Sequence, residues 1–373
     1  MRVALITEFY YPHLGGVTEH VHNLARTLTG SGHHAVIITS HMQAARAHEL
    51  EPSDLDPAQV HRVGTSRIIY SAGSFARVTT GIHLRRQIRE ILRRERIDLV
   101  HVHGGLNPTL GLVAPDAAGE LDIPVVATFH SWFFRSALCR IFRRPLQQRL
   151  DRHGAVIAVS QPVVEAHARY FEADWKIIPN GVDTAFFRPV PPSAGLLSEL
   201  LFLGRLDPRN GLDTVLSAMP TVLERFPGVR LTVAGDGPLR PVYERLAAPV
   251  ARQVEFVGGV NGNRPEFYSR AQLYLCPTTK ASFGITLLEA MACATPMVVS
   301  DITGFRELVS GGEEAVLVPR GDPKAWAEII IALLGDELRR RRMGAAGLRK
   351  VARFAWPRVA QEVTSVYRSV LGC

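Results

Sequence analysis

The feature that most constrains the fold of this chain is a regular alternation of short apolar runs with helical patterns, repeated in two series. In the first series, strand-length segments rich in apolar residues stand at residues 3–6, 35–39, 99–103, 124–128 and 155–159. In the second, they stand at residues 200–204, 229–235, 254–257, 273–276, 297–300 and 315–318. Continuous apolar runs are typical of strands covered on both faces, and helices between them favour a parallel sheet. The pattern therefore predicts an α/β fold.

A Pro-rich stretch separates the two series. Residues 188–195 read Arg-Pro-Val-Pro-Pro-Ser-Ala-Gly, a composition typical of a linker. The chain has 373 residues, which is more than a single domain usually contains. We therefore predict two doubly wound, Rossmann-like domains, residues 1–187 and 196–355, that face each other across a cleft.

Composition excludes several classes of protein. The net charge of +8 comes mostly from arginine, but neither aromatic platforms nor a recognisable module accompany it, so we expect no nucleic-acid partner. No apolar run approaches the ~20 residues of a membrane-spanning helix. The first apolar run ends at Thr7 and Glu8, which makes it a poor signal peptide. The four cysteines have no metal or redox spacing, so we expect a cytoplasmic protein.

Two segments concentrate the positive charge. Residues 83–96 combine arginines with Leu and Ile at helical intervals, and residues 132–144 mix aromatic side chains with arginines. Two interpretations stay open for both segments. They are solvated helix faces, or they contact an anionic membrane surface or an acidic acceptor. The second interpretation predicts peripheral attachment at the inner face of the membrane.

A strand, a glycine turn and a helix follow one another at residues 272–292. The turn contains Phe283 and Gly284, and the helical pattern begins at Ile285. A helix N-terminus in such a turn presents free backbone N–H groups and a positive dipole end, so it can bind a phosphate. Glu289 falls on the first turns of that helix, where a carboxylate can accept two hydroxyls of a sugar. An ordinary βαβ turn with a solvated glutamate is the alternative.

Paired glycines also occupy the first strand-to-helix turn. Gly15 and Gly16 lack the third glycine of a dinucleotide fingerprint, and no acidic residue closes the next strand. We therefore expect no dinucleotide site at this turn. The glycines would still allow the backbone to approach a phosphate or a sugar closely.

Seven short motifs, taken together and in order, resemble a known family. They are Gly15-Gly16-Val17, Ala127 to His130, Ile178 to Asp183, Leu203-Gly204-Arg205, Ala234 to Pro238, Ser282 to Met291, and Ser300 to Glu307. Over nearly the whole chain the sequence resembles the retaining nucleotide-sugar glycosyltransferases of family 4, which have the GT-B fold. Within the family it is most similar to phosphatidylinositol mannosyltransferases and to the catalytic subunit that adds N-acetylglucosamine in GPI-anchor synthesis.

The resemblance implies which substrate each domain binds. The N-terminal domain would hold a lipid-linked or small-molecule acceptor, and the C-terminal domain a UDP- or GDP-sugar. Residues 356–373 would form a helix that crosses back and completes the N-terminal domain. The resemblance implies a transfer that needs no metal, so we expect neither a metal nor a cofactor at the diphosphate.

The resemblance also assigns roles to residues. His130 and Arg205 would be catalytic, with Arg205 stabilising the leaving diphosphate. Glu289 would bind the 2′ and 3′ hydroxyls of the ribose. The remaining donor-site positions are Gly16, Asn210, Gly284, Ile285, Thr286 and Leu288. We interpret His101 and His103, which alternate on a strand, as structural residues.

Two positions depart from the family pattern. Asn210 stands where the family has a lysine, and Ala281 stands where it has a glutamate that contacts the transferred sugar. Arg209 and Lys280 lie next to these positions and offer possible replacements. We expect a retaining, metal-independent hexosyltransferase. A catalytically weak or inactive protein that acts as a nucleotide-binding or scaffold partner is the alternative, and a nucleotide-sugar epimerase of the same fold is a third possibility.

Overall fold

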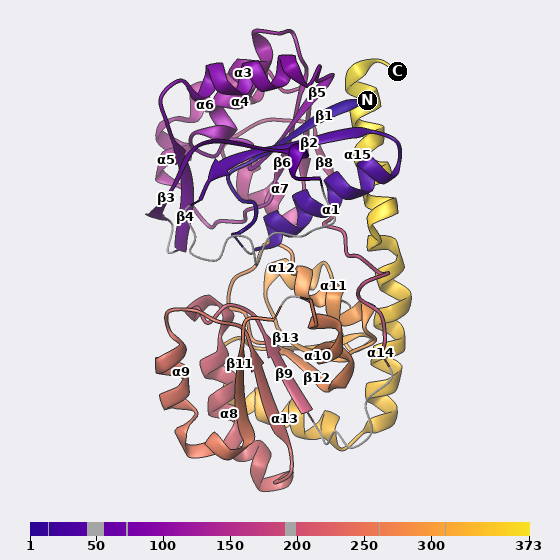
Figure 1. The fold of residues 1–373 in the computed structure, drawn as a ribbon. Coiled ribbons are helices and arrows are strands. Elements are labelled where there is room, and N and C mark those ends of the chain that lie inside the picture. Colours follow the sequence, from indigo (N-terminus) through magenta and orange to yellow (C-terminus); the bar gives the residue numbers. More distant parts are fainter. Residues whose placement is uncertain (14, 43–55, 72–73, 191–198, 261, 310) are drawn as a thin grey trace. The chain divides into compact units, whose positions relative to one another are not determined.

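The computed structural model describes residues 1–373 except residues 14, 43–55, 72–73, 191–198, 261 and 310 (Figure 1). The chain forms two compact units. The first unit consists of Met1–Gly181 and Trp356–Cys373, and the second unit of Val182–Ala355. The chain therefore passes between the units twice, and its last helix belongs to the unit that contains its N-terminus.

The described residues of the first unit form one eight-stranded sheet, in the order β4-β3-β2-β1-β5-β6-β7-β8. Its strands are β1 (Arg2–Thr7), β2 (His34–His41), β3 (Val60–Ser71), β4 (Ser74–Thr80), β5 (Leu99–His103), β6 (Val125–Phe129), β7 (Ala155–Ala158) and β8 (Trp175–Ile177). All neighbouring strands are parallel except β3 and β4. The helices are α1 (Gly16–Gly30), α3 (Leu84–Arg94), α4 (Leu110–Gly119), α5 (Ala137–Ile141), α6 (Arg143–Leu150), α7 (Gln161–Ala168) and α15 (Trp356–Leu371).

Helices cover both faces of this sheet, as the apolar runs require. On β1, Val3 and Leu5 pack into one core cluster with apolar residues of α1 and α15. Ala4 and Ile6 point to the opposite face and pack with α3 and α4. Because successive side chains of a strand alternate between faces, a strand buried on both sides has to be apolar throughout.

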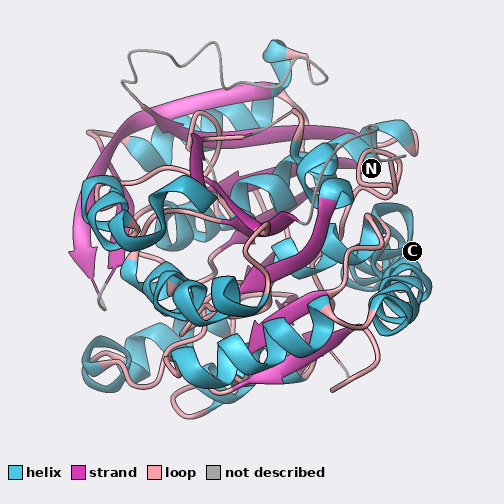
Figure 2. Ribbon diagram, turned by 90° about the horizontal axis from the view of Figure 1, so that it is seen from below, coloured by secondary structure: helices cyan, strands magenta, loops and turns pink. Residues whose placement is uncertain are grey.

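The second unit contains a parallel sheet that has six strands among the described residues, in the order β11-β10-β9-β12-β13-β14. Its strands are β9 (Glu199–Leu203), β10 (Arg230–Ala234), β11 (Val254–Gly258), β12 (Ala271–Cys276), β13 (Met297–Ser300) and β14 (Ala315–Val318). Its helices are α8 (Leu212–Arg225), α9 (Arg240–Leu246), α10 (Arg264–Arg270), α11 (Ile285–Ala292), α12 (Thr303–Arg306), α13 (Pro323–Leu334) and α14 (Glu337–Val351). Figure 2 shows helices on both sides of the strands.

The strand order of each sheet reverses at one point. In the first unit β1 lies between β2 and β5, and in the second β9 lies between β10 and β12. In doubly wound sheets, ligands bind beyond the carboxyl ends of the strands at this switch point. We therefore expect the first unit to carry a site at the carboxyl ends of β1 and β5. In the second unit we expect a site at the carboxyl ends of β9 and β12.

The structure corrects two details of the sequence interpretation. The antiparallel pair β3 and β4 was missed, because polar residues interrupt the apolar runs on both strands. The second unit begins at Val182, earlier than the boundary predicted after residue 187. Phe187 is buried against the Tyr268 ring of α10, and this contact attaches the segment to the second unit. Residues 191–195 of the predicted linker lie outside the described residues.

Candidate functional site

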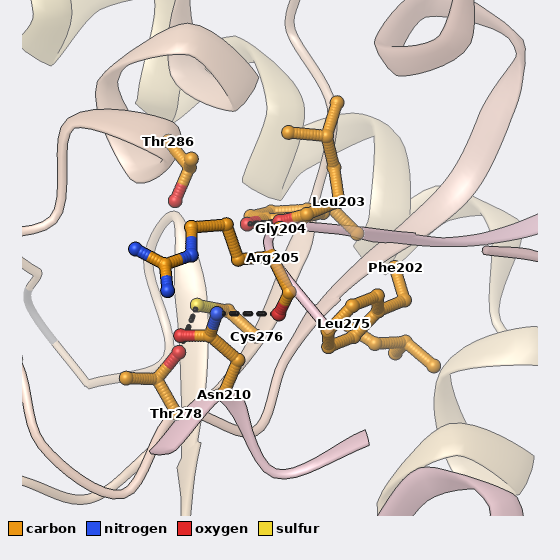
Figure 3. Close-up of a pocket in the computed structure, with 10 residues that line it drawn as sticks. Phe202, Leu203, Gly204, Arg205, Asn210, Leu275, Cys276, Thr278 and Thr286 are labelled. Atoms are coloured by element: carbon orange, nitrogen blue, oxygen red, sulfur yellow. Dashed lines mark hydrogen bonds between the residues drawn. The ribbon is translucent and has the colours of Figure 1, made fainter. Parts of the chain in front are cut away.

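A pocket of about 200 Å³ opens at the switch point of the second unit (Figure 3). The carboxyl ends of β9 and β12 form its floor through Phe202 to Gly204 and Tyr274 to Cys276. Arg205, Asn210, Thr278 and Thr286 line the rest of it. The pocket therefore combines an apolar base with a few polar groups, the composition typical of a small-molecule site.

Arg205 supplies the positive charge of this pocket. Its side chain is 45% exposed, and its Nη2 lies 3.5 Å from Oδ2 of Asp207. Asp207 also accepts a hydrogen bond from the backbone N–H of Arg209 and begins the 3₁₀ turn Pro208–Asn210. Asp207 thus holds Arg205 by an exposed ion pair of low energy, which an anion bound in the pocket can replace.

Asn210 has a structural role in the same loop. Its Nδ2 donates a hydrogen bond of 2.7 Å to the carbonyl oxygen of Arg205 (Figure 3). The next residue, Gly211, has φ +67°, and a Cβ there would lie 2.2 Å from the carbonyl oxygen of Pro277. The loop is therefore packed closely against the strand β12 side of the pocket, and the Asn210 amide stabilises it rather than adding a cation.

The glycine turn predicted from the sequence leads directly into α11. Gly284 is the residue before the helix, with φ +105°, and a Cβ at this position would lie 2.8 Å from the ring of Phe305. Ile285 and Thr286 begin the helix, and Thr286 reaches the pocket. N–H groups of a first helical turn have no partner within their own helix, so this turn can donate to an anion beside Arg205. Leu288, also predicted for the donor site, is fully buried.

Glu289 is buried in an ion pair that the sequence did not predict. Its carboxylate is 2% exposed. Nη1 of Arg264 donates to Oε1 at 2.7 Å, and the hydroxyl of Tyr268 donates to Oε2 at 2.9 Å. Arg264 also lies over the ring of Phe187, 5.1 Å from its centroid. A ribose that binds Glu289 has to share the two oxygens with these protein groups.

A cluster of histidines occupies the switch point of the first unit. His103 ends β5, His130 follows β6, and His20 lies on α1. Nδ1 of His103 is 3.1 Å from Nε2 of His130, and the His20 ring meets the His130 ring edge to face at 4.8 Å. Burial lowers the pKa of His20 to about 4, and it lowers the pKa values of His103 and His130 well below the usual value. The three rings are therefore neutral at pH 7.

His101 and His103 differ in their surroundings. Nδ1 of His101 lies 2.6 Å from the hydroxyl of Tyr367, and Nε2 lies 2.6 Å from Oγ1 of Thr128. Both ring nitrogens are thus satisfied, as a structural residue requires. His103 instead contacts His130, which the sequence interpretation did not anticipate.

The first loop of the first unit is organised by a carboxylate that the sequence analysis missed. Glu8 follows β1 and is buried. It accepts hydrogen bonds from the hydroxyls of Thr79 and Thr109 and from the N–H of Leu110, the last at 2.7 Å. Burial is the main cause that raises the pKa of Glu8. Gly15 is the residue before α1 and Gly16 is its first residue, so the paired glycines form the N-terminus of this helix.

The basic segment at residues 132–144 exposes large apolar side chains. Phe134 is 61% exposed, Leu138 61%, Ile141 70% and Phe142 50%. The segment contains the short helix α5 and the start of α6, and its arginines are interspersed with these residues. Within the described residues, no helix combines the length and the apolar character that a membrane crossing requires.

Comparison with known proteins assigns the family. Residues 14–186 match the family model described as Glycosyltransferase Family 4, and residues 198–336 match the model described as Glycosyl transferases group 1. The chain is 32% identical to the phosphatidyl-myo-inositol mannosyltransferase of Mycobacterium leprae, over 99% of its own length and 97% of the relative's. It is 33% identical to the Mycobacterium tuberculosis protein of the same name, over 100% and 98%. The chain belongs to glycosyltransferase family 4.

Solved structures agree with the fold expected from the sequence. The Anabaena protein Alr3699/HepE in complex with UDP superposes with a TM-score of 0.80 at 19% identity, covering 99% of this chain and 100% of that one. Sucrose-phosphate synthase from Thermosynechococcus elongatus gives a TM-score of 0.76 at 22% identity, with 100% and 99% covered. These likenesses confirm the GT-B fold expected from the sequence. The resemblance to phosphatidylinositol mannosyltransferases is confirmed as well.

Proposed function

We propose that this glycosyltransferase moves a hexosyl group from a nucleoside-diphosphate sugar to an acceptor hydroxyl, with retention of the anomeric configuration and without a metal at the diphosphate. The observation that carries the proposal is the pocket at the β9–β12 switch point, where Arg205 and the first turn of α11 lie together. The complexes of Anabaena HepE with UDP and with UDP-glucose support a nucleotide-sugar donor.

The chemistry follows from where charge develops. When the bond between the anomeric carbon and the diphosphate oxygen breaks, negative charge accumulates on the leaving diphosphate. Arg205 and the N–H groups of Gly284, Ile285 and Thr286 would stabilise that charge. The acceptor attacks from the face that the diphosphate leaves, and a diphosphate oxygen takes the acceptor's proton. His130 would hydrogen-bond the transferred sugar or the acceptor as a neutral ring, and Glu289 would bind the ribose.

The names of the relatives indicate which substrates to test first. Both mycobacterial relatives are named phosphatidyl-myo-inositol mannosyltransferases, so mannosyl donors and inositol phospholipids come before other hexoses and acceptors. Turnover is measured by chromatography of the product with UDP- and GDP-hexoses, and the anomeric configuration by NMR coupling constants. An inverted product would exclude the retaining mechanism. Donor conversion to an epimer without acceptor would favour the epimerase.

The second candidate is a catalytically weak or inactive protein of this fold. It is suggested by Asn210 and Ala281, which replace the lysine and the glutamate of the family pattern. The Asn210 amide bonds the Arg205 carbonyl, so lysine at 210 removes one loop contact while adding a cation. We compare the wild type with Ala281→Glu, Asn210→Lys and the double variant. The proposal expects turnover by the wild type. Turnover only in the double variant, with none in the wild type on any donor, would instead favour a binding or scaffold protein.

We also propose that the first unit attaches peripherally to an anionic membrane. The support is the exposed apolar set Phe134, Leu138, Ile141 and Phe142 among arginines, a combination typical of interfacial segments. Co-sedimentation with anionic and neutral liposomes tests this. We expect binding to anionic liposomes, and its loss in Ile141→Asp but not in the control Leu338→Asp. The control changes a leucine of the second unit that is 65% exposed, against 70% for Ile141. Equal binding to both liposomes, or none, would contradict the proposal.

A further inference from the structure

The histidine cluster of the first unit has the arrangement of a metal site. One ring nitrogen from each of His20, His103 and His130 lies within 4.8 Å of the others. The three side chains come from a helix, a strand end and the residue after a second strand, so packed elements hold all of them. His20 and His103 are buried and His130 is partly exposed, which leaves an approach from solvent on one side.

Two ring nitrogens of the cluster are unsatisfied. Nδ1 of His20 and Nε2 of His103 are buried and have no hydrogen-bond partner among the described residues. A buried polar atom without a partner costs about 1–3 kcal/mol, so such atoms usually mark a bound ion or water. His101 packs against His103 but has partners on both nitrogens. Oδ1 of Asn180, a buried neighbour of His20, is likewise unsatisfied, so the unpaired atoms lie in the three rings and directly beside them.

The chemistry of the donors selects the class of ion. Imidazole nitrogen suits Zn²⁺ and its neighbours in the first transition series, whereas Mg²⁺ and Ca²⁺ prefer oxygen ligands. Two nitrogens bound to one tetrahedral Zn²⁺ at about 2.0–2.1 Å from each lie roughly 3.4 Å apart. The His103 and His130 nitrogens are already 3.1 Å apart. The ion would bind Nδ1 of His103 in place of that atom's contact with His130. The ring proton would then lie on the unpaired Nε2, where a bound water can accept it.

We propose that His20, His103 and His130 bind one divalent transition-metal ion of the Zn²⁺ class, with the fourth position open to water. Three protein ligands and an open position are the composition of many accessible zinc sites. A consequence rests on the proposed function. If His130 contacts the sugar or the acceptor, the bound ion occupies the ring nitrogen that makes this contact. Zn²⁺ then inhibits sugar transfer, and a chelator restores the activity.

Metal binding is tested directly on the full chain, without substrates. The protein is treated with a chelator, dialysed, and titrated with Zn²⁺ by calorimetry and with Co²⁺ by visible absorption. We expect one tight equivalent and the d–d bands of a tetrahedral, nitrogen-bound Co²⁺. His103→Gln and His20→Gln should each weaken binding at least tenfold. The control His167→Gln, which changes another buried histidine of the same unit with a pKa of about 4, should bind as the wild type does.

Three results would overturn the metal site. They are the absence of a tight equivalent, equal affinity in wild type and His103→Gln, and thiolate charge-transfer bands that assign the Co²⁺ to cysteines. Thermal unfolding without metal shows whether each variant is folded, and a Zn²⁺-dependent rise of the melting temperature in wild type but not in His103→Gln supports the site independently. Zn²⁺ binding without sugar transfer under any condition supports the site and contradicts the proposed function. Sugar transfer without Zn²⁺ binding supports the proposed function and contradicts the metal site.

Discussion

The substitution Glu289→Gln tests the buried ion pair and the donor site together. Glu289 is 2% exposed and the side chain of Arg264 is 17% exposed, so the substitution removes the negative charge from a largely buried ion pair. Loss of one partner of such a pair costs about 3–5 kcal/mol. Glutamine keeps one acceptor oxygen, so we expect the lower end, about 3 kcal/mol. For a unit of this size that corresponds to a decrease in melting temperature of roughly 6–12 °C.

Glu289→Gln should also weaken nucleotide binding. A hydrogen bond to a charged group contributes about 1.5–3 kcal/mol, so loss of the carboxylate raises the Kd for UDP or GDP by roughly 10- to 100-fold. Calorimetry measures the Kd at a temperature where the variant is folded. The matched control is Glu314→Gln, which breaks another buried ion pair of the second unit, with Lys350. It should lose stability but keep nucleotide affinity.

Two results would refute this reasoning. If Glu289→Gln melts within about 1 °C of the wild type, the pair with Arg264 does not contribute the stability that we assign to it. If Glu289→Gln and Glu314→Gln weaken nucleotide binding equally, the effect arises from general destabilisation and the ribose role of Glu289 is wrong.

Three further predictions concern other parts of the two sites. Arg205→Gln should lower kcat on the order of 10²–10³ while changing the nucleotide Kd less, because its charge matters most in the transition state, and steady-state kinetics beside calorimetry would show this. The pKa of His20 falls from 6.5 to about 4 on folding, so its stabilising contribution is complete above pH 6.5 and is lost as the pH falls towards 4. Between pH 6.5 and 5, protonation of His20 in the unfolded chain should lower the free energy of unfolding by about 2 kcal/mol. Urea unfolding should show a smaller loss of stability over this range in His20→Gln. Gly284→Ala should destabilise the second unit by about 1–3 kcal/mol because of its φ of +105°, whereas Gly228→Ala, in open space, should have little effect on urea unfolding.

The fold could be predicted largely from local patterns. Strands such as β1 and β13 are largely apolar because helices cover both of their faces, and that requirement is visible in the sequence. The turn before α11 could be predicted because a positive φ beside a tightly packed ring requires glycine at 284. The antiparallel pair β3 and β4 could not be predicted, because polar residues interrupt both strands and their apolar residues follow no regular spacing.

The partners of the site residues could not be predicted, because they come from distant parts of the chain. Arg264 lies 25 residues before Glu289, on a different helix, and nothing in its local sequence distinguishes it from a solvated arginine. Glu8 and Thr109 are 101 residues apart and meet only because β1 and β5 are neighbours in the sheet. His20 joins His103 and His130 for the same topological reason. Sequence motifs located the ends of the strands, and the folded sheet determined which side chains meet there.

The most direct test of the account is sugar transfer by the purified wild-type chain in the presence of EDTA. The measurement follows product formation from nucleoside-diphosphate hexoses, mannosyl donors first, with an inositol phospholipid acceptor in anionic liposomes. We predict turnover with retained configuration, undiminished by the chelator. Absence of turnover with every donor and acceptor, or turnover that EDTA abolishes and Mg²⁺ or Mn²⁺ restores, would contradict it.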